Sequence, residues 1–469
     1  MSTIDRRTFL AGAGTTAATL TLVQGLGLRA AAAADHGRPP RDPGYGALAP
    51  RRPDFAGPGA DPGLAWLAVP PGFRYGVFGL SGSPMSDGHP TPYGHDGMGA
   101  FPARHGRVRL VRNHEVRDNA GVTPPPSATN AYDTQAGGGN TTLELSVSRH
   151  GVRLHEDFVS LSGTHTNCAG GETPWGSWLS CEEVTVGAAN GFAREHGYVF
   201  EVPSRADGPV VPTPLPALGR FNHEAACIDE DTGIVYETED NGNSGFFRFL
   251  PQRRHDLSAG RLQMLAVDGQ PNRDLRTGLQ VGDGFRTTWV DIDDPDPAGG
   301  DGKAVYNQGI AGGGAVFRRL EGTFFDRGDV WFTSTDGGDA HQGQVWRFQP
   351  SHRGTGRLEL VYESPDSDTL SFPDNLAVSP RGGVLLCEDT SRPPIAQPFS
   401  EQYLKGLTSR GQLFDFALNV VDNSEFAGAC WSPDGSVLFV NTQGETNAVA
   451  DPRPSRTYAI WGPWERGAL

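Results

Sequence analysis

The segment NCAGGETPWGSWLSCEE (residues 167–183) brings two thiols and two carboxylates close together in the chain. Cys168 and Cys181 lie thirteen positions apart, and two glutamates end the segment. The thiols predict either a disulfide or a thiolate metal ligand, and a thiolate beside carboxylates suits iron or zinc better than calcium. Five cysteines leave at least one unpaired. Because Cys181 occupies a repeated slot that it shares with Cys387, we expect Cys168 to be the metal ligand and Cys181 to be structural.

Polar residues also end six short strand-like segments that recur along the chain. One such ending is usually a turn, but six with several carboxylates predict a ring of oxygen ligands at one mouth of the fold. Carboxylates this close repel one another unless cations lie between them, and calcium takes six to eight oxygen ligands. The endings are Asn113-His114-Glu115, Cys181-Glu182-Glu183, Thr238-Glu239-Asp240, Ser334-Thr335-Asp336, Cys387-Glu388-Asp389 and Asn441-Thr442-Gln443.

Three other stretches carry residues that suit a charged substrate. In FRRLEG, Arg319 and Glu321 are two positions apart, which places them on one face of a strand. Since a guanidinium binds phosphate in a bidentate manner, Arg319 predicts either an ion pair or a phosphate clamp beside a metal ligand. RFNHEAA contains Glu224, and FPDNLAV contains Asp374, which is also typical of a turn. No GxSxG, HExxH, Walker or GxGxxG motif accompanies them.

Paired strand segments must position these residues. A second aromatic-rich segment usually follows each polar ending, as GYVFEVP (197–203) follows the first cysteine-containing segment. Six repeats of this pair predict an all-β fold, specifically a six-bladed β-propeller with an irregular N-terminal lead-in. The alternative is an irregular all-β sandwich. The sequence shows no long helical period, and only EQYLKGL (401–407) is predicted to form one or two helical turns.

The amino-acid composition and net charge indicate the fold class and argue against some classes of binding partner. The 64 glycines and 37 prolines are interleaved with aromatic and β-branched runs, which is typical of many turns between short strands. The formal net charge is −16. This charge argues against a nucleic-acid partner, which needs stripes of lysine and arginine, and is compatible with bound calcium.

The N-terminus predicts export. Arg6 and Arg7 precede a weakly apolar stretch and an alanine run, as in a twin-arginine signal peptide over residues 1–34. The apolar stretch is interrupted by polar residues, so we expect no permanent membrane anchor. The predicted organisation is this signal peptide, an irregular lead-in over 35–65 and a single propeller domain over 66–469. We expect the twin-arginine export machinery as a partner and a periplasmic or extracellular location.

Taken together, these motifs resemble the PhoX family of secreted alkaline phosphatases. The resemblance is carried by the twin-arginine start, HDGM, RNHE, NCAGGETPWGSWLSCEE, RFNHEAA with YETED, RRLEG and FPDN with LLCED, in the family's order over residues 95–389. It implies a six-bladed propeller with Ca²⁺ and Fe³⁺ at its centre, and hydrolysis of phosphomonoesters at alkaline pH. This chain is shorter than the best-known members, and Leu320 replaces the family's usual proline between the arginine and the glutamate.

The resemblance also implies roles for individual residues. Cys168 matches the thiolate ligand of iron, and either Glu224 or Glu239 matches a second, acidic iron ligand. Arg319 matches the arginine that holds phosphate, and Glu321 matches a metal-binding glutamate. The implied members of the calcium shell are Asn113, Glu115, Glu182, Asp374 and Glu388.

The resulting hypothesis is metal-assisted transfer of a phosphoryl group to water, without a covalent enzyme intermediate. Two alternatives use the same fold. A calcium-dependent propeller hydrolase of another class, such as a lactonase, would need neither Cys168 nor Arg319. A non-catalytic binding propeller stabilised by calcium would need no reactive centre.

Overall fold

The computed structural model describes residues 43–117, 130–148, 151–298, 302–351, 354–390, 401–444 and 454–469. Residues Pro43–Leu469 form one compact unit. The predicted signal peptide, residues 1–34, and the start of the predicted lead-in lie outside the described residues. In the part of the chain that is described, no helix has both the length and the apolar character needed to cross a membrane.

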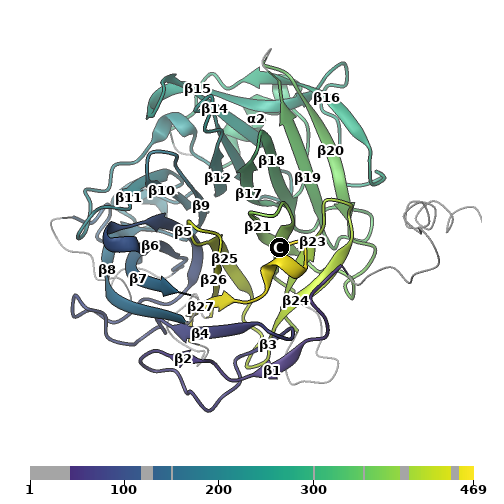
Figure 1. The fold of residues 1–469 in the computed structure, drawn as a ribbon. Coiled ribbons are helices and arrows are strands. Elements are labelled where there is room, and N and C mark those ends of the chain that lie inside the picture. Colours follow the sequence, from purple (N-terminus) through teal and green to yellow (C-terminus); the bar gives the residue numbers. More distant parts are fainter. Residues whose placement is uncertain are drawn as a thin grey trace, which may run out of the picture. The chain divides into compact units, whose positions relative to one another are not determined.

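Six inner strands surround the centre of this unit. Each lies against the next one along the chain, and the last lies against the first, which closes a ring (Figure 1). The ring shows a propeller-like arrangement, and the prediction of an all-β fold of this kind is confirmed. The inner strands are β5 (His95–Pro102), β9 (Asn167–Glu172), β12 (His223–Ile228), β17 (Leu320–Asp326), β21 (Pro373–Val378) and β25 (Phe426–Trp431).

Each inner strand forms an antiparallel hairpin with the strand that follows it. These second strands are β6 (Arg107–His114), β10 (Ser177–Glu182), β13 (Val235–Glu239), β18 (Asp329–Ser334), β22 (Val384–Glu388) and β26 (Val437–Thr442). Outer strands extend each hairpin: β7 (Gly138–Ser148), β8 (Gly151–Thr164), β11 (Val199–Pro203), β14 (Phe246–Arg253), β15 (Asp256–Val267), β19 (Gln344–Pro350), β20 (Gly356–Glu363), β23 (Tyr403–Leu407), β24 (Leu413–Asn419) and β27 (Arg456–Trp461).

The described strands form five hydrogen-bonded sheets, whereas the strand repeats predicted six separate units. The difference comes from β16 (Gly284–Asp291), which pairs with β15 on one side and with β20 on the other. This bridge joins two four-stranded segments into one nine-stranded sheet.

The lead-in contains strands as well as irregular chain. β1 (Ala49–Arg51) and β2 (Phe55–Ala56) lie within it, and β3 (Leu67–Val69) and β4 (Arg74–Phe78) follow. β3 pairs with β24, and β4 pairs with β27 near the C-terminus. The beginning of the described chain therefore adds strands to two sheets, each of which is otherwise built from later parts of the chain.

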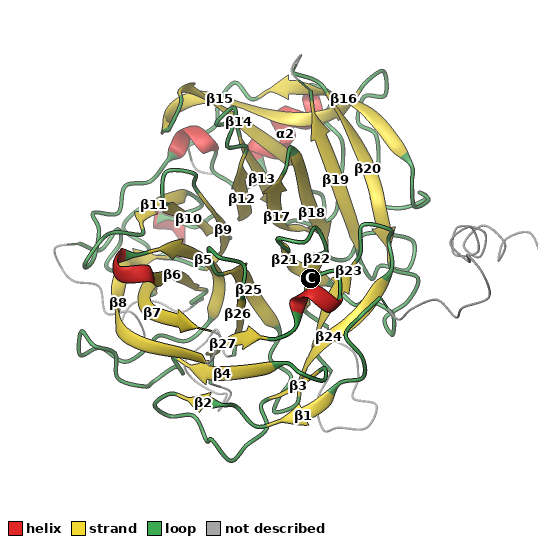
Figure 2. Ribbon diagram, viewed as in Figure 1, coloured by secondary structure: helices red, strands yellow, loops and turns green. Residues whose placement is uncertain are grey.

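Helices contribute little to this fold (Figure 2). The described helical elements are α2 (Ala304–Ala311) and the 3-10 turns η1 (Arg104–Gly106), η2 (Ala188–Asn190), η3 (Pro216–Leu218) and η4 (Trp464–Arg466). The predicted helical turns in 401–407 are wrong, because Tyr403–Leu407 form strand β23. There Leu404 and Leu407 are buried and Lys405 pairs with Asp415 of β24 across the strands.

Apolar side chains fill the spaces between the sheets. One core cluster joins Val345 of β19 to Leu376 of β21 and Leu386 of β22, and so connects two neighbouring sheets. Strands β12 and β22 are buried along their whole length, as expected for sheets that pack face to face. This packing fixes the inner strands and therefore the side chains that they direct towards the centre.

Candidate metal centre

A β-bulge occurs at the same place in five of the six inner hairpins. In β5, for example, Asp96 and Gly97 together oppose Asn113 of β6, and the register shifts between His95 and Met98. The strands β9, β12, β17 and β21 shift in the same way, directly after their first residue. Bulges redirect side chains, and here each begins at a residue with metal-binding chemistry. Those second-position residues are Asp96, Cys168, Glu224, Glu321 and Asp374.

A second set of acidic residues follows the neighbouring strands. In each hairpin the last residue of the second strand pairs with the first residue of the inner strand, as His114 pairs with His95. The next residue along the chain therefore lies at the same mouth as the bulge. At four of these positions it is a carboxylate: Glu115, Glu183, Asp240 and Asp389.

These side chains form four linked groups. In one group, Cys168 Sγ and single carboxylate oxygens of Glu183 and Glu224 all lie within 4.8 Å of one another. The other groups are Asp96–Glu115–Cys168, Glu224–Glu321–Asp374 and Asp374–Asp389–Glu425, defined by the same limit. Consecutive groups share a member, so nine potential ligands form one continuous cluster at the centre.

Burial dominates the electrostatics of this cluster. Desolvation, followed by repulsion from Asp389, raises the pKa of Asp374 to about 7. Desolvation and neighbouring carboxylates also raise the pKa values of Asp96 and Glu224 well above the ordinary range. The pKa of the Cys168 thiol is raised by burial first and by Asp96 second. Without cations, the cluster resists carrying its full negative charge.

The donor set fits bound metal ions. Glu224 is fully buried, yet neither of its carboxylate oxygens accepts a hydrogen bond from an N–H or O–H group of the described residues. Buried polar atoms normally have partners, so an unpartnered carboxylate that faces a thiol and other carboxylates suits a cation. Carboxylate oxygens suit hard ions, and the single thiol adds a softer ligand.

Arg319 lies at the edge of the cluster, with 34% of its side chain exposed. Its Nε and Nη2 donate to Asp240 at 3.0 and 3.1 Å, and Nη2 lies 3.0 Å from Glu321 Oε1. Burial disfavours its charge, but Glu321 and Asp240 outweigh burial and raise its pKa. Its backbone has φ of +40°, a conformation that non-glycine residues rarely adopt. The predicted arginine is thus held, still partly open to solvent, above the predicted glutamate.

A second arginine lies at the same mouth and was not predicted. Arg117 Nε donates to Glu115 Oε1 at 2.7 Å, and more than half of the Arg117 side chain is exposed. The charges of Glu115, Glu183 and Cys168 favour its protonated form and raise its pKa. Arg117 and Arg319 therefore approach the cluster beside different carboxylates.

Four of the predicted ligands lie outside the linked groups. Glu239 accepts from the Gly245 N–H at 2.9 Å and from Asn241 at 3.1 Å, and burial raises its pKa to about 8. Glu388 accepts from the backbone N–H of Ser371. Burial opposes ionisation of Glu182, but His196 and backbone donors outweigh it and lower its pKa.

The fourth, Asn113, forms hydrogen bonds with backbone carbonyl groups. Its side-chain amide donates to the carbonyl oxygens of Cys168 and Ala169 in the next sheet, at 2.9 and 2.7 Å. Its own oxygen accepts from Trp178 Nε1 and Ser180 Oγ. Both ends of this amide are therefore in use within the protein.

The structure thus selects one acidic residue from each of two predicted strand endings. Both endings of the predicted ring contain two acidic residues, and the structure brings Glu183 and Asp389 into the cluster rather than Glu182 and Glu388, which the family resemblance implied as calcium ligands, because successive side chains point to opposite faces. Two members of the cluster, Asp96 and Glu425, were not predicted from the sequence. A usable signal was present: HD, NC, HE, LE and PD begin five inner strands with a potential ligand in second place.

The five cysteines lie in different surroundings. All five lie in described residues and are free thiols, so the structure contains no Cys168–Cys181 disulfide. Cys181 and Cys387 lie opposite the bulges of β9 and β21, on the second strands. Only Cys168 has its sulfur in one of the linked groups described above.

Comparison with known proteins identifies the family. A solved structure of PhoX from Pseudomonas fluorescens, in complex with the transition-state analogue vanadate, has a TM-score of 0.66 and 17% sequence identity and covers 91% of this chain and 99% of its own. The gluconolactonase XC5397 from Xanthomonas campestris has a TM-score of 0.40 and 12% identity, with 91% and 99% coverage. No curated protein sequence gives a significant match. A family model described as alkaline phosphatase PhoX matches residues 54–445, and we conclude that this chain belongs to the PhoX family and is a phosphatase.

Proposed function

We propose that the protein is a secreted phosphatase that hydrolyses phosphomonoesters at a central site containing Fe³⁺ and Ca²⁺. The observation that supports this most directly is the chain of four linked ligand groups, which contains the unpartnered carboxylate of Glu224, beside a partly exposed arginine. Such a site combines cation binding with recognition of an anionic group.

Within this proposal, Cys168 is the thiolate ligand of iron and Glu224 is its acidic companion. Glu224 is favoured over Glu239 because its oxygens lack hydrogen-bond donors and lie in the group of Cys168, whereas Glu239 already binds protein donors. Glu115, Glu183, Glu321, Asp374, Asp389, Glu425 and Asp96 complete the ligand set. When bound, the ions polarise phosphoryl oxygens and neutralise the charge that develops on them.

The residues of the chain bind and orient the substrate. Arg319 has a planar donor set that matches phosphoryl oxygens, and Asp240 holds its guanidinium in one orientation. We assign Arg117 as a second anion-binding group, on the side of the cluster formed by Glu115 and Glu183. Two arginines at one mouth favour an anionic substrate over a neutral lactone.

The proposal extends to architecture and location. We infer six blades, with the nine-stranded sheet counted as two blades that β16 joins. We also propose that residues 1–34 direct export through the twin-arginine machinery, to the periplasm or beyond the cell, and that 66–469 is the propeller domain. A reporter fused to residues 1–34, tested with Arg6 and Arg7 replaced by lysine, checks the export route.

Two measurements test the activity. Elemental analysis of the exported protein should find iron together with calcium, whereas calcium alone would favour a lactonase-like hydrolase or a binding propeller. Turnover of an aryl phosphate should be lost in Arg319→Ala while the fold and the metal content remain. If Cys168→Ala kept both iron and activity, the assignment of the thiolate would be wrong.

A further inference from the structure

Glu182 occupies a position next to the metal cluster but is bound entirely by protein groups. One carboxylate oxygen accepts from the backbone N–H of His165 at 2.9 Å and lies 2.6 Å from His196 Nδ1. The other accepts from the N–H groups of Gly197 and Tyr198 at 2.8 and 3.1 Å. Four donors saturate a carboxylate, which has about four lone-pair sites. This buried side chain therefore anchors two backbone segments, one at His165 and one at Gly197 and Tyr198.

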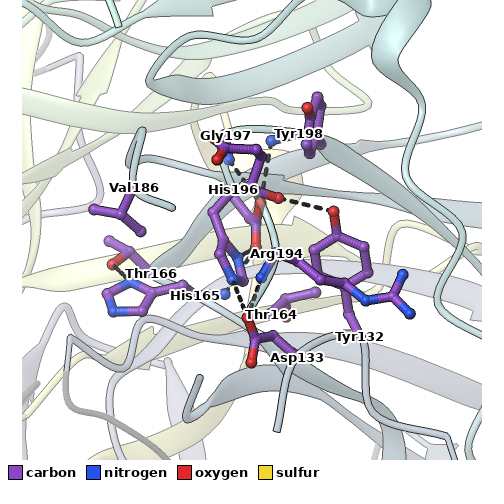
Figure 3. A network of polar contacts seen from close by, with 12 residues as sticks. Tyr132, Asp133, Thr164, His165, Thr166, Val186, Arg194, His196, Gly197 and Tyr198 are labelled. Carbon is purple, nitrogen blue, oxygen red and sulfur yellow. Dashed lines mark hydrogen bonds and ion pairs between the residues drawn. The ribbon is translucent and has the colours of Figure 1, made fainter. Parts of the chain in front are cut away.

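His196 connects this anchor to a second carboxylate. Its ring is fully buried, and Nε2 lies 3.5 Å from Asp133 Oδ2. Asp133 in turn accepts from the backbone N–H groups of Ala193 and Arg194 at 2.7 and 2.8 Å. Figure 3 shows the imidazole directed towards Asp133, with Tyr132 close by; the two rings meet edge to face at 5.3 Å. The imidazole can therefore rotate only by breaking contacts at both of its nitrogens.

The anchored segment controls the placement of metal-binding residues. Thr166 follows His165 and has φ of +47°, an unfavourable conformation for a β-branched residue. Its N–H donates to the carbonyl of Val116 at 3.1 Å, and its carbonyl accepts from the N–H of Glu183 at 2.9 Å. Cys168 is two residues further along the chain. One turn thus links the backbone beside Glu115, the backbone of Glu183 and the approach to Cys168.

We propose that Glu182 and His196 are positioning residues that hold the Thr164–Asn167 turn, so that Cys168 and Glu183 are presented together to a metal ion. The inference rests on the proposed function and adds residues that do not touch the metal. Partners of this kind, one step removed from the ligands, typically change metal affinity by about 10–100-fold when they are altered.

The test uses Co²⁺, because a thiolate bound to Co²⁺ gives a near-ultraviolet charge-transfer band that is independent of turnover. The full-length exported protein is stripped of metal and titrated with Co²⁺ as wild type, Glu182→Gln and His196→Gln. Asp157→Asn is the matched control: Asp157 is also buried and binds Ser86, but it lies on the outer strand β8. Thermal unfolding shows whether each variant is folded. If Glu182→Gln does not fold, the inference is tested with His196→Gln alone.

Both variants should bind Co²⁺ about 10–100-fold more weakly than wild type, with a weaker band, and Asp157→Asn should bind like wild type. Folded variants with wild-type affinity and band would overturn the inference and leave the proposed function intact. If wild type itself showed no thiolate band, the assignment of Cys168 would fail, and this inference with it.

Discussion

Asn113 of β6 donates from its side-chain amide to the carbonyl oxygen of Cys168 at 2.9 Å, across the boundary between two sheets. The same kind of contact recurs around the ring. Thr238 Oγ1 donates to the carbonyl of Glu321 at 2.5 Å, and Thr333 Oγ1 donates to that of Asp374 at 2.7 Å. The backbones of these three ligands are thus held by the preceding hairpin of the ring, which couples the metal centre to packing between neighbouring hairpins.

Replacing Asn113 with alanine should therefore damage both stability and metal retention. The carbonyls of Cys168 and Ala169 and the indole N–H of Trp178 would lose a buried partner, and each unsatisfied group costs about 1–3 kcal/mol. Urea unfolding and the rate of metal loss to a chelator measure the two effects. Asn307→Ala, at an exposed position of α2, should change neither; an unchanged Asn113→Ala would show that the contact is dispensable.

Arg319→Ala should reduce kcat/KM for an aryl phosphate by about 10²–10³-fold, the usual effect of removing a donor that stabilises developing charge. The kcat/KM of Arg319→Lys should lie between those of wild type and Arg319→Ala, because lysine keeps the charge but loses the planar donor set. Metal content should not change. If the variants lost metal in parallel with activity, the role of Arg319 would instead be to hold Glu321 in position as a metal ligand.

Arg117→Gln should mainly raise KM and the inhibition constant for inorganic phosphate, since Arg117 is exposed and contributes charge at the mouth. The salt dependence of kcat/KM should also weaken, because screening acts on exposed charges. Steady-state kinetics at two ionic strengths test this. Equal KM values in variant and wild type would limit Arg117 to pairing with Glu115.

The metal-free protein should lose stability as the pH rises. Burial and mutual repulsion raise the pKa values of Asp96, Glu224 and Asp374 in the folded state, to about 7 for Asp374. The folded chain therefore retains protons that the unfolded chain releases near its ordinary carboxyl pKa of about 4. The stabilisation is complete below about pH 4 and is lost as the pH passes upward through the raised values.

Urea unfolding in a chelator over a pH series measures this slope. Added Ca²⁺ should restore stability at high pH, and Glu224→Gln should make the slope of the metal-free protein shallower. Stability that increased with pH in the absence of metal would contradict the proposed repulsion within the cluster.

Arg456→Met should destabilise the protein by about 3–5 kcal/mol, the usual cost of breaking a buried ion pair by removing one partner. Arg456 is fully buried and donates to Asp422 at 2.8 and 3.1 Å. Arg286→Met, which breaks an exposed pair with Asp268, is the control and should cost less than about 1 kcal/mol. If chemical denaturation gave similar losses in the free energy of unfolding for Arg456→Met and Arg286→Met, burial of the Arg456 pair would have little effect on stability.

The sequence predicted the strand repeats and the chemistry of the centre because both are local signals. A strand with a polar ending is visible in a few residues, and Cys168, Glu224, Glu321 and Asp374 stand in short distinctive motifs. The bulges could not be predicted, because a bulge is a mismatch between two strands and neither strand reveals it alone. For this reason the sequence could not show which of Glu182 and Glu183, both members of the predicted ring, lies at the centre; the structure brings Glu183 there.

Pairings between segments that are distant in the chain could not be predicted from the sequence either. Glu425 precedes β25 and joins Asp374 and Asp389 only because the last inner strand returns to the ring. β16 pairs with the edge strands β15 and β20, and nothing in the sequence of β16 indicates these two partners. The short segment 401–407 was mistaken for a helical turn because its partner, β24, decides its conformation.

The pairing of β4 with β27 sets an order of assembly. Strand β27 ends at Trp461, so the sheet that contains β4 and β27 cannot form until the ribosome has released the chain up to that residue. The cluster residues extend from Asp96 to Glu425 and come together only in the closed ring. A nascent chain that stops before Glu425 can therefore offer only part of the binding site.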